Sequence, residues 1–67
     1  MRLKELRIEK GITHKQLSDD IGVPVRTISR WEKGETDMLL RNAIKLAEYF
    51  GVTLDEFVQP NRSIGNK

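Results

Sequence analysis

The sequence predicts an all-α fold built around a helix-turn-helix, and three observations lead to that prediction. Apolar residues recur at helical spacing, as with Leu17 and Ile21 and then with Ile28 and Trp31. Gly22 lies between these two pairs, where a chain that leaves one helix often needs a positive backbone angle. No segment reads convincingly as a strand. Two short helices joined by a tight turn therefore form the centre of the predicted fold.

The first two helices are expected over residues 2–9 and 14–21, and each has a boundary signal beside it. Gly11, just beyond the first helix, is a typical stop signal. Thr13 is a favourable N-cap for the second helix, because its hydroxyl can accept one of the unbonded N–H groups of the first turn.

The third helix is expected to start with Pro24 and to end near Lys33 and Gly34. Proline suits the first helical position because the N–H that it lacks would be unbonded there in any case. It also biases Val23 toward an extended conformation, which shapes the turn before the helix.

A fourth helix is expected from Met38 to Tyr49 or Phe50, after a polar loop in which Thr36 or Asp37 provides the N-cap. Its apolar residues recur at helical spacing and form a predicted buried face: Ala43, Leu46, Ala47 and Phe50.

A short fifth helix is expected after Thr53, which forms a capping-box pattern with Glu56 three positions later. Phe57 gives this helix an apolar side. Residues 1–59 are therefore expected to form one helix-turn-helix domain, and the polar residues 60–67 a flexible C-terminal tail.

The size and composition of the chain limit what it does. Sixty-seven residues make one small domain. The chain has no Cys and one His, and no nucleophile–base pair or phosphate loop is recognisable, so no enzyme, metal, cofactor or small-molecule substrate is expected. No apolar run approaches the roughly 20 residues that span a bilayer, so we expect a cytoplasmic protein without membrane association.

Charge is distributed unevenly along the chain. Residues 22–34 carry three basic side chains and one acidic, a net +2, whereas residues 35–59 carry two basic and five acidic, a net −3. This asymmetry suits a protein with one side that faces an anion such as the DNA backbone.

Taken together, these features resemble the Cro/Xre-type family of DNA-binding domains, typified by the phage lambda and 434 repressors and by Cro. The elements that carry the resemblance are, in chain order, Leu6-Arg7, Gly11-Ile12-Thr13, Leu17, Gly22, Thr27-Ile28-Ser29, Trp31-Glu32, Gly34, Leu46-Ala47 and Gly51-Val52. The resemblance covers residues 1–58. It implies a five-helix, lambda-repressor-like DNA-binding domain, with the helix-turn-helix formed by helices 2 and 3 and double-stranded DNA as the partner.

The resemblance assigns base contacts to the exposed side of the third helix. The family's base-reading positions fall on Val25, Arg26 and Arg30, with Ser29 on the same face. Arginine can bond both O6 and N7 of a guanine, whereas Val25 meets only an apolar edge such as a thymine methyl. We expect Arg26 and Arg30 to contact DNA; the alternative is that they are ordinary solvated charges.

Phosphate contacts are expected around the N-terminus of the second helix, where backbone N–H groups face an anion. The candidates are Thr13, His14, Lys15 and Gln16, with Thr27 and Lys33 on the third helix. His14 stands where many relatives have a Gln that bonds phosphate. A phosphate contact and an exposed side chain without a role fit its position equally well.

Arg7 and Glu32 are expected to form a structural salt bridge. In relatives an Arg on the first helix pairs with a Glu at the end of the recognition helix, and both residues are present here. Breaking a fully buried pair from one side costs about 3–5 kcal/mol, whereas a surface bridge contributes roughly 0–1 kcal/mol. Trp31 shares the apolar stripe with Ile28 and is expected in the core rather than stacked on a base.

The start of two helices departs from the family pattern. Pro24 replaces the usual Ser or Thr cap of the recognition helix. Met38 and Leu39 stand where relatives usually have Pro and a capping Ser or Thr. With Leu40 they form an apolar run that either packs into the core or lines a protein contact.

The leading functional hypothesis is a sequence-specific transcriptional regulator of Cro or repressor type that reads an operator through the major groove. The alternatives are an antitoxin that binds DNA and a toxin protein, and a protein-interaction module with the same fold. Because one recognition helix makes few base contacts, we expect a homodimer on a pseudo-palindromic operator. Its pairing surface is expected in the acidic second half, around residues 54–58 and Ile64.

Overall fold

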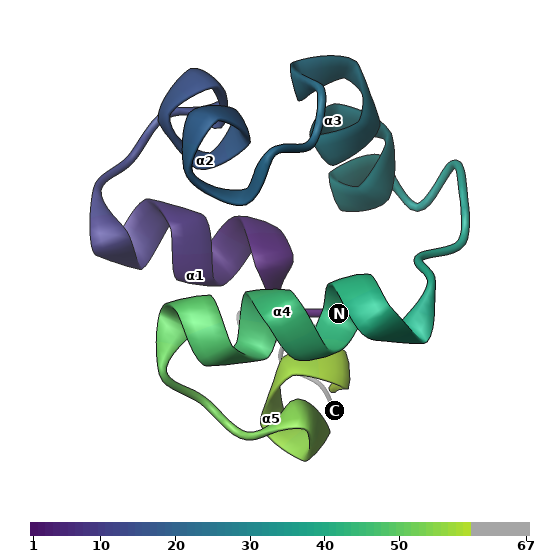
Figure 1. The fold of residues 1–67 in the computed structure, drawn as a ribbon. Coiled ribbons are helices and arrows are strands. Elements are labelled where there is room, and N and C mark those ends of the chain that lie inside the picture. The colour runs from purple at the N-terminus through teal and green to yellow at the C-terminus, as the bar shows by residue number, and fades with distance from the viewer. Residues whose placement is uncertain (60–67) are drawn as a thin grey trace.

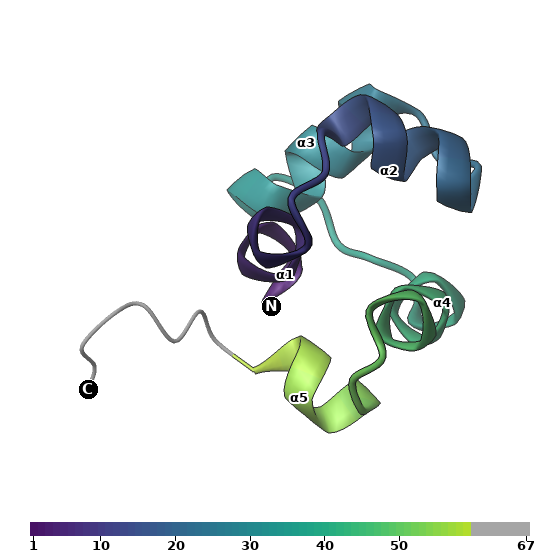
Figure 2. The same cartoon turned by 90° about the vertical axis from the view of Figure 1, so that its left-hand side faces the viewer.

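A computed structural model describes residues 1–59 as five helices: α1 (Leu3–Lys10), α2 (His14–Ile21), α3 (Val25–Lys33), α4 (Leu40–Phe50) and α5 (Leu54–Val58). α2 and α3 form an upper layer, α4 and α5 a lower one, and α1 lies between them (Figures 1 and 2). Residues 1–59 contain no strand. The predicted all-α, five-helix fold with a helix-turn-helix is confirmed. The expected flexible tail, residues 60–67, and Ile64 lie outside the described residues.

One hydrophobic core joins all five helices. Its buried members are Leu3, Leu6, Leu17, Ile21, Ile28, Trp31, Ala43, Leu46, Ala47 and Phe57. Trp31 is only 4% exposed, so its predicted place in the core is confirmed. Phe50 was expected on the buried face of α4 but is only partly buried against this cluster. A domain of this size buries only about 60% of its unfolded surface, so every member of this core matters to its stability.

The turn between α2 and α3 depends on Gly22 and Pro24. Gly22 has a φ of 72°, in the left-handed region that favours glycine, as predicted. Pro24 was expected at the first helical position but is instead the N-cap of α3, with a ψ of 145°. Its carbonyl accepts hydrogen bonds from the N–H groups of Thr27 at 3.0 Å and Ile28 at 3.1 Å. The backbone of Pro24 is therefore extended rather than helical, and only its carbonyl takes part in the hydrogen bonds of α3.

The predicted N-caps of α2 and α5 are both present. The hydroxyl of Thr13 accepts the N–H of Gln16 at 3.1 Å, and the Gln16 side chain accepts the N–H of Thr13 at 2.8 Å. Thr53 and Glu56 form the same reciprocal pair, with both bonds at 3.1 Å. Such caps stabilise a helix start by about 1 kcal/mol each, which helps helices as short as these.

α4 begins later than predicted and lacks the predicted cap. Its N-cap is Leu39, with φ −64° and ψ 146°, and no side chain bonds the first turn. The expectation that Thr36 or Asp37 caps the helix was therefore wrong. Met38 packs against the core from outside the helix. This tertiary contact favours an extended backbone just before α4. The helix therefore starts after Leu39, and neither Thr36 nor Asp37 caps it.

The N-terminus is tied to the far end of the domain. The N–H of Arg2 donates to the carbonyl of Phe57 at 2.9 Å. Arg2 is the N-cap of α1, which therefore runs one residue later at each end than the predicted range of 2–9. The buried Arg2 side chain pairs with Glu5 at 3.0 Å. Among the helices of residues 1–59, none has the length and apolar character needed to span a bilayer.

Candidate nucleic-acid interface

The outer side of α3 presents a row of basic side chains. Arg26, Arg30 and Lys33 follow one another at spacings of four and three residues, so they lie on one face of the helix, and all three are exposed. Ile28 and Trp31, on the opposite side, are buried in the core. The packing of α3 therefore holds this basic face toward solvent.

Val25 and Ser29 lie one turn apart at the edge of the basic face. Val25 is the first residue of α3 and is 40% exposed. Ser29 is partly buried. The expected base-contact residues Val25, Arg26 and Arg30 thus reach solvent together, whereas Ser29 sits deeper, toward α1 and α2.

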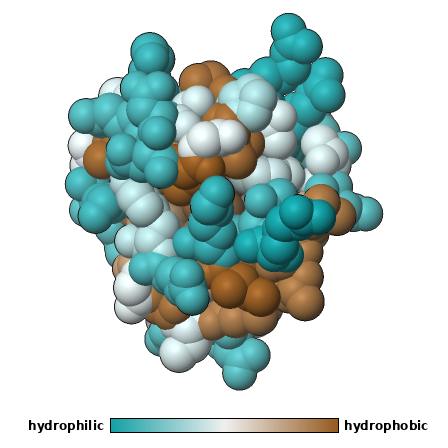
Figure 3. All heavy atoms as spheres, in the orientation of Figure 1, coloured by the Kyte–Doolittle hydropathy of each residue, from teal (hydrophilic) through white to brown (hydrophobic). Residues whose placement is uncertain are grey.

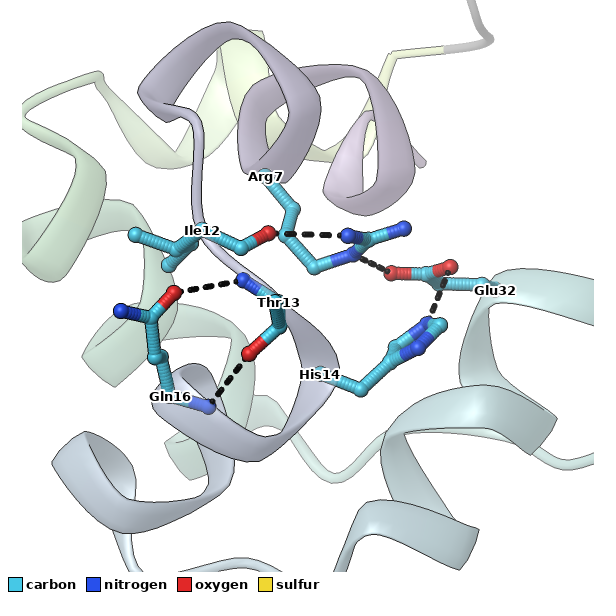
Figure 4. A network of polar contacts seen from close by, with 6 residues as sticks. All are labelled: Arg7, Ile12, Thr13, His14, Gln16 and Glu32. Atoms are coloured by element: carbon cyan, nitrogen blue, oxygen red, sulfur yellow. Dashed lines mark hydrogen bonds and ion pairs between the residues drawn. The ribbon is translucent and has the colours of Figure 1, made fainter.

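Three helices meet at the carboxylate of Glu32 (Figure 4). Nε of Arg7, on α1, donates to one carboxylate oxygen at 2.8 Å. Nε2 of His14, the first residue of α2, lies 3.0 Å from the other. A neutral His14 with its proton on Nε2 and a protonated ring both satisfy this contact. The contact between His14 and Glu32 was not anticipated from the sequence.

Arg7 makes a second hydrogen bond, to the backbone between α1 and α2. A terminal nitrogen of its guanidinium donates to the carbonyl of Ile12, in the link between α1 and α2, at 2.9 Å (Figure 4). The side chains of Arg7 and Glu32 are only 13% and 7% exposed. Removing either partner would leave a poorly solvated charge, so this pair belongs nearer to the buried class of ion pair than to the surface class.

The surroundings of Glu32 favour its ionised form. Burial is the largest influence and acts to raise the pKa of Glu32, but the hydrogen bonds and charges of Arg7 and His14 outweigh it, so this pKa is lowered. The carboxylate therefore remains negative and bonded to both neighbouring helices at neutral pH.

The expected phosphate-contact residues around the start of α2 all have partners within the chain: Thr13, His14, Lys15 and Gln16. Thr13 and Gln16 bond each other in the capping box. Nζ of Lys15 lies 3.2 Å from a carboxylate oxygen of Asp19, and both side chains are largely exposed. A surface pair of this kind is worth about 0–1 kcal/mol, so Lys15 is readily released to another anion. On α3, Thr27 is partly buried and Lys33 is exposed.

An open hollow of about 350 Å³ lies among α1, α2 and α3. Its lining residues are Lys4, Arg7, His14, Ser29, Glu32 and Lys33. Basic groups outnumber the single carboxylate, and that carboxylate is already engaged. Lys4 was missed as a candidate contact; its place one turn before Arg7 on α1 was the available signal. Within residues 1–59, no group of three or more His, Cys, Asp or Glu residues could hold a metal ion.

α4 supports the C-terminal end of α2. Nζ of Lys45 donates to the carbonyl of Ile21 at 3.0 Å, and the Tyr49 hydroxyl donates to a carboxylate oxygen of Asp20 at 2.6 Å. The bond to Asp20, with a smaller effect of burial, raises the pKa of Tyr49. One of the last carbonyls of α2, which have no helical partner, is therefore satisfied by the layer below.

Comparison with known proteins identifies the family. A family model described as helix-turn-helix matches residues 3–57, which span the five helices almost completely. The chain belongs to the Cro/C1-type helix-turn-helix family. It is therefore a DNA-binding domain of the class that transcriptional regulators carry.

Several helix-turn-helix proteins are similar to this chain. It is 29% identical over 62 residues to the cryptic phage CTXphi transcriptional repressor RstR of Vibrio cholerae, covering 92% of this chain and 56% of RstR. It is 32% identical over 57 residues to the HTH-type transcriptional activator BcrR of Enterococcus faecalis, covering 85% of this chain and 28% of BcrR. A regulator of Methanocaldococcus jannaschii is 36% identical over 55 residues, 82% of this chain and 83% of that protein. The chain thus spans about half of RstR and about a quarter of BcrR. No solved structure matches it significantly.

Proposed function

We propose that this helix-turn-helix domain acts as a sequence-specific transcriptional regulator that reads an operator through the major groove. The observation that carries the proposal is the exposed row of Arg26, Arg30 and Lys33 on a helix whose other side is fixed in the core. In this function Arg26 and Arg30 bond base edges, with guanine as the best match, and Val25 meets an apolar edge. Ser29 is the fourth base-contact candidate. The domain acts by binding, not by catalysis.

Backbone contacts are assigned to the residues that surround this face: Thr13, His14, Lys15, Gln16, Thr27 and Lys33. These groups would fix the position of α3 on the duplex without reading sequence. Lys4 lines the same open hollow as Lys33, adds positive charge there and is a further candidate. A regulator of this kind would act in the cytoplasm.

The network around Glu32 is assigned a positioning role. Base readout requires side chains that are held in place before the ligand arrives. Arg7 and His14 bind Glu32 from two other helices, which supports such a role for these residues. None of the three needs to touch a base for the recognition helix to depend on them.

We further propose that the functional unit on DNA is a homodimer on a pseudo-palindromic operator. Four candidate base contacts on one α3 helix specify too little sequence for a single site in a genome. Two copies would place their recognition helices about 34 Å apart, one DNA turn. RstR is named a repressor and BcrR an activator, so both directions of regulation occur among the relatives. An interaction module that never reads DNA would leave the basic face of α3 unexplained.

Selection of bound duplexes from a random pool tests the proposed function. The expected result is enrichment of one motif arranged as an inverted repeat. A variant with both Arg26→Ala and Arg30→Ala should enrich no motif while retaining its helical circular dichroism. If the folded parent protein enriches nothing, sequence-specific reading is wrong. An enriched single motif without a repeat would leave DNA reading in place and contradict the dimer.

A further inference from the structure

The beginning of α4 exposes an apolar stripe. Leu39 and Leu40 are 62% and 64% exposed, and Ile44, one turn after Leu40, is 42% exposed. In Figure 3 much of the lower right of the visible face, over α4, is hydrophobic. Contiguous apolar surface of this kind marks interaction sites more often than single exposed residues do.

Leu39 is poorly suited to its position if the domain acts alone. It is the N-cap of α4, where a polar side chain would bond the first turn, and it provides no such bond. Its side chain is also largely exposed, so the core gains little from it. A contact with another molecule explains an apolar side chain at this position, whereas helix capping and core packing do not.

Charges of both signs flank the apolar stripe. Arg41 follows Leu40 directly and Glu48 follows Ile44 by one turn; both are exposed, and neither forms an ion pair within residues 1–59. A two-fold interface must be complementary to itself. If two α4 helices pack antiparallel, Arg41 of each copy approaches Glu48 of the other, so this arrangement of charges fits a second copy of the chain.

The position of α4 in the fold also fits pairing with a second copy of the chain. In Figure 1, α4 runs across the molecule below α2 and α3, and in Figure 2 it is seen end-on at the edge of the lower layer. A two-fold axis beside α4, directed from the lower layer to the upper one, makes the two α4 helices antiparallel. The same axis keeps both α3 helices on one side of the dimer, as binding to one duplex requires.

We propose that Leu39, Leu40 and Ile44 form the surface on which a second copy of this chain pairs. The proposal rests on the proposed function, since it locates the interface of the dimer that reads a two-fold operator. Pairing is expected to be weak in solution, because three side chains supply only part of the about 800 Å² that each partner buries in a standard interface. Neighbouring half-sites on DNA raise the effective concentration and strengthen it.

The surface expected from the sequence, around residues 54–58, is a poorer candidate. Phe57 is fully buried and Leu54 is packed partly against the core. Among the apolar side chains of this segment, only Val58, at 52%, is largely exposed. Most of the hydrophobic surface of residues 54–58 is therefore buried in the core and is not free for pairing.

The test uses the full chain with two duplexes: the inverted repeat from the selection and a duplex with one half-site. Leu40→Ser removes apolar surface at an exposed position, and Ile8→Ser, at an exposed position on α1, is the matched control. Leu40→Ser should weaken binding to the repeat by about tenfold or more, and leave half-site binding within about twofold of the parent. Sedimentation at a protein concentration between the parent's Kd for the repeat and its Kd for the half-site should find two copies of the parent per repeat and at most one copy of this variant. Ile8→Ser should match the parent in all three measurements.

Charge reversal gives a second test that does not depend on removing apolar surface. Arg41→Glu and Glu48→Arg should each weaken binding to the repeat, and the two together should restore it, with half-site binding unchanged throughout. Parental behaviour of Leu40→Ser, or the absence of rescue in the doubly reversed variant, would overturn this pairing surface. If the parent binds the half-site but only one copy occupies the repeat, pairing is wrong and DNA reading stands. If the parent binds neither duplex, both proposals fail.

Discussion

Arg7 and Glu32, 25 positions apart in the chain, connect α1 to the end of α3 through a 2.8 Å contact between guanidinium Nε and a carboxylate oxygen. His14 adds α2 to the same carboxylate. The orientation of α3 is therefore linked to two other helices by polar contacts at Glu32, whose side chain is only 7% exposed. Disturbing the network should affect DNA binding through the position of α3.

The first prediction concerns the energy of this pair. Glu32→Ala should destabilise the fold by up to about 3 kcal/mol, the lower end of the range for a buried pair, because Arg7 would lose its partner while retaining limited access to water. Chemical denaturation gives this free energy of unfolding. Glu9→Ala, which removes an exposed acid from α1, is the matched control and should change stability by no more than about 0.5 kcal/mol.

A double-mutant cycle separates the pair from its surroundings. Arg7→Ala should also destabilise the fold, and the double variant should lose clearly less than the sum of the two single losses. DNA affinity should follow the same non-additive pattern. Losses that add fully would mean that the two side chains do not depend on each other.

The second prediction is a pH dependence set by Glu32. Its pKa is lowered in the fold, so its ionised form stabilises the native state at pH values above the ordinary pKa of about 4.3. That contribution is lost as the pH falls below this value and through the lower pKa of the folded state. The stability of the parent relative to Glu32→Gln should therefore be greater at pH values above this ordinary pKa and should shrink on acidification. A difference that grows on acidification would contradict the assignment.

Much of the fold could be predicted because its signals are local. The apolar spacing of Leu17 and Ile21, the glycine at position 22 and the capping box at Thr13 each act within one or two helical turns. The start of α4 could not be predicted from local rules. Thr36 and Asp37 are good caps, but the packing of Met38 against the core overrides them.

The polar contacts between helices were harder to foresee. His14 contacts Glu32 across 18 positions, and Tyr49 donates to Asp20 across 29. Such contacts depend on the angles and positions at which the helices pack, and these cannot be predicted from the spacing of residues along the chain. Arg7 and Glu32 were paired in advance only because the chain resembles a known family.

The third prediction concerns sequence-independent binding. Lys33→Ala should weaken binding to all duplexes alike, because Lys33 is assigned to phosphate and not to a base. The slope of the logarithm of affinity against the logarithm of salt concentration should become shallower by about 0.9 for each phosphate that the variant no longer neutralises. Lys15→Ala should act in the same direction. A variant that changed the preferred sequence would show that the side chain reads bases instead.

The last prediction concerns base readout by Arg26. Arg26→Ala should cost about 1–3 kcal/mol of binding to the selected operator, because the variant lacks a guanidinium that bonds two acceptors of one base. The variant should discriminate less among bases at a single base pair per half-site. Competition with duplexes that carry one base-pair substitution each measures this discrimination. Arg41→Ala on a half-site duplex is the matched control: Arg41 is also an exposed arginine but lies on α4, in the layer opposite α3. If Arg26→Ala bound the selected operator as tightly as the parent, with its base preferences intact, α3 would not be the helix that reads the sequence.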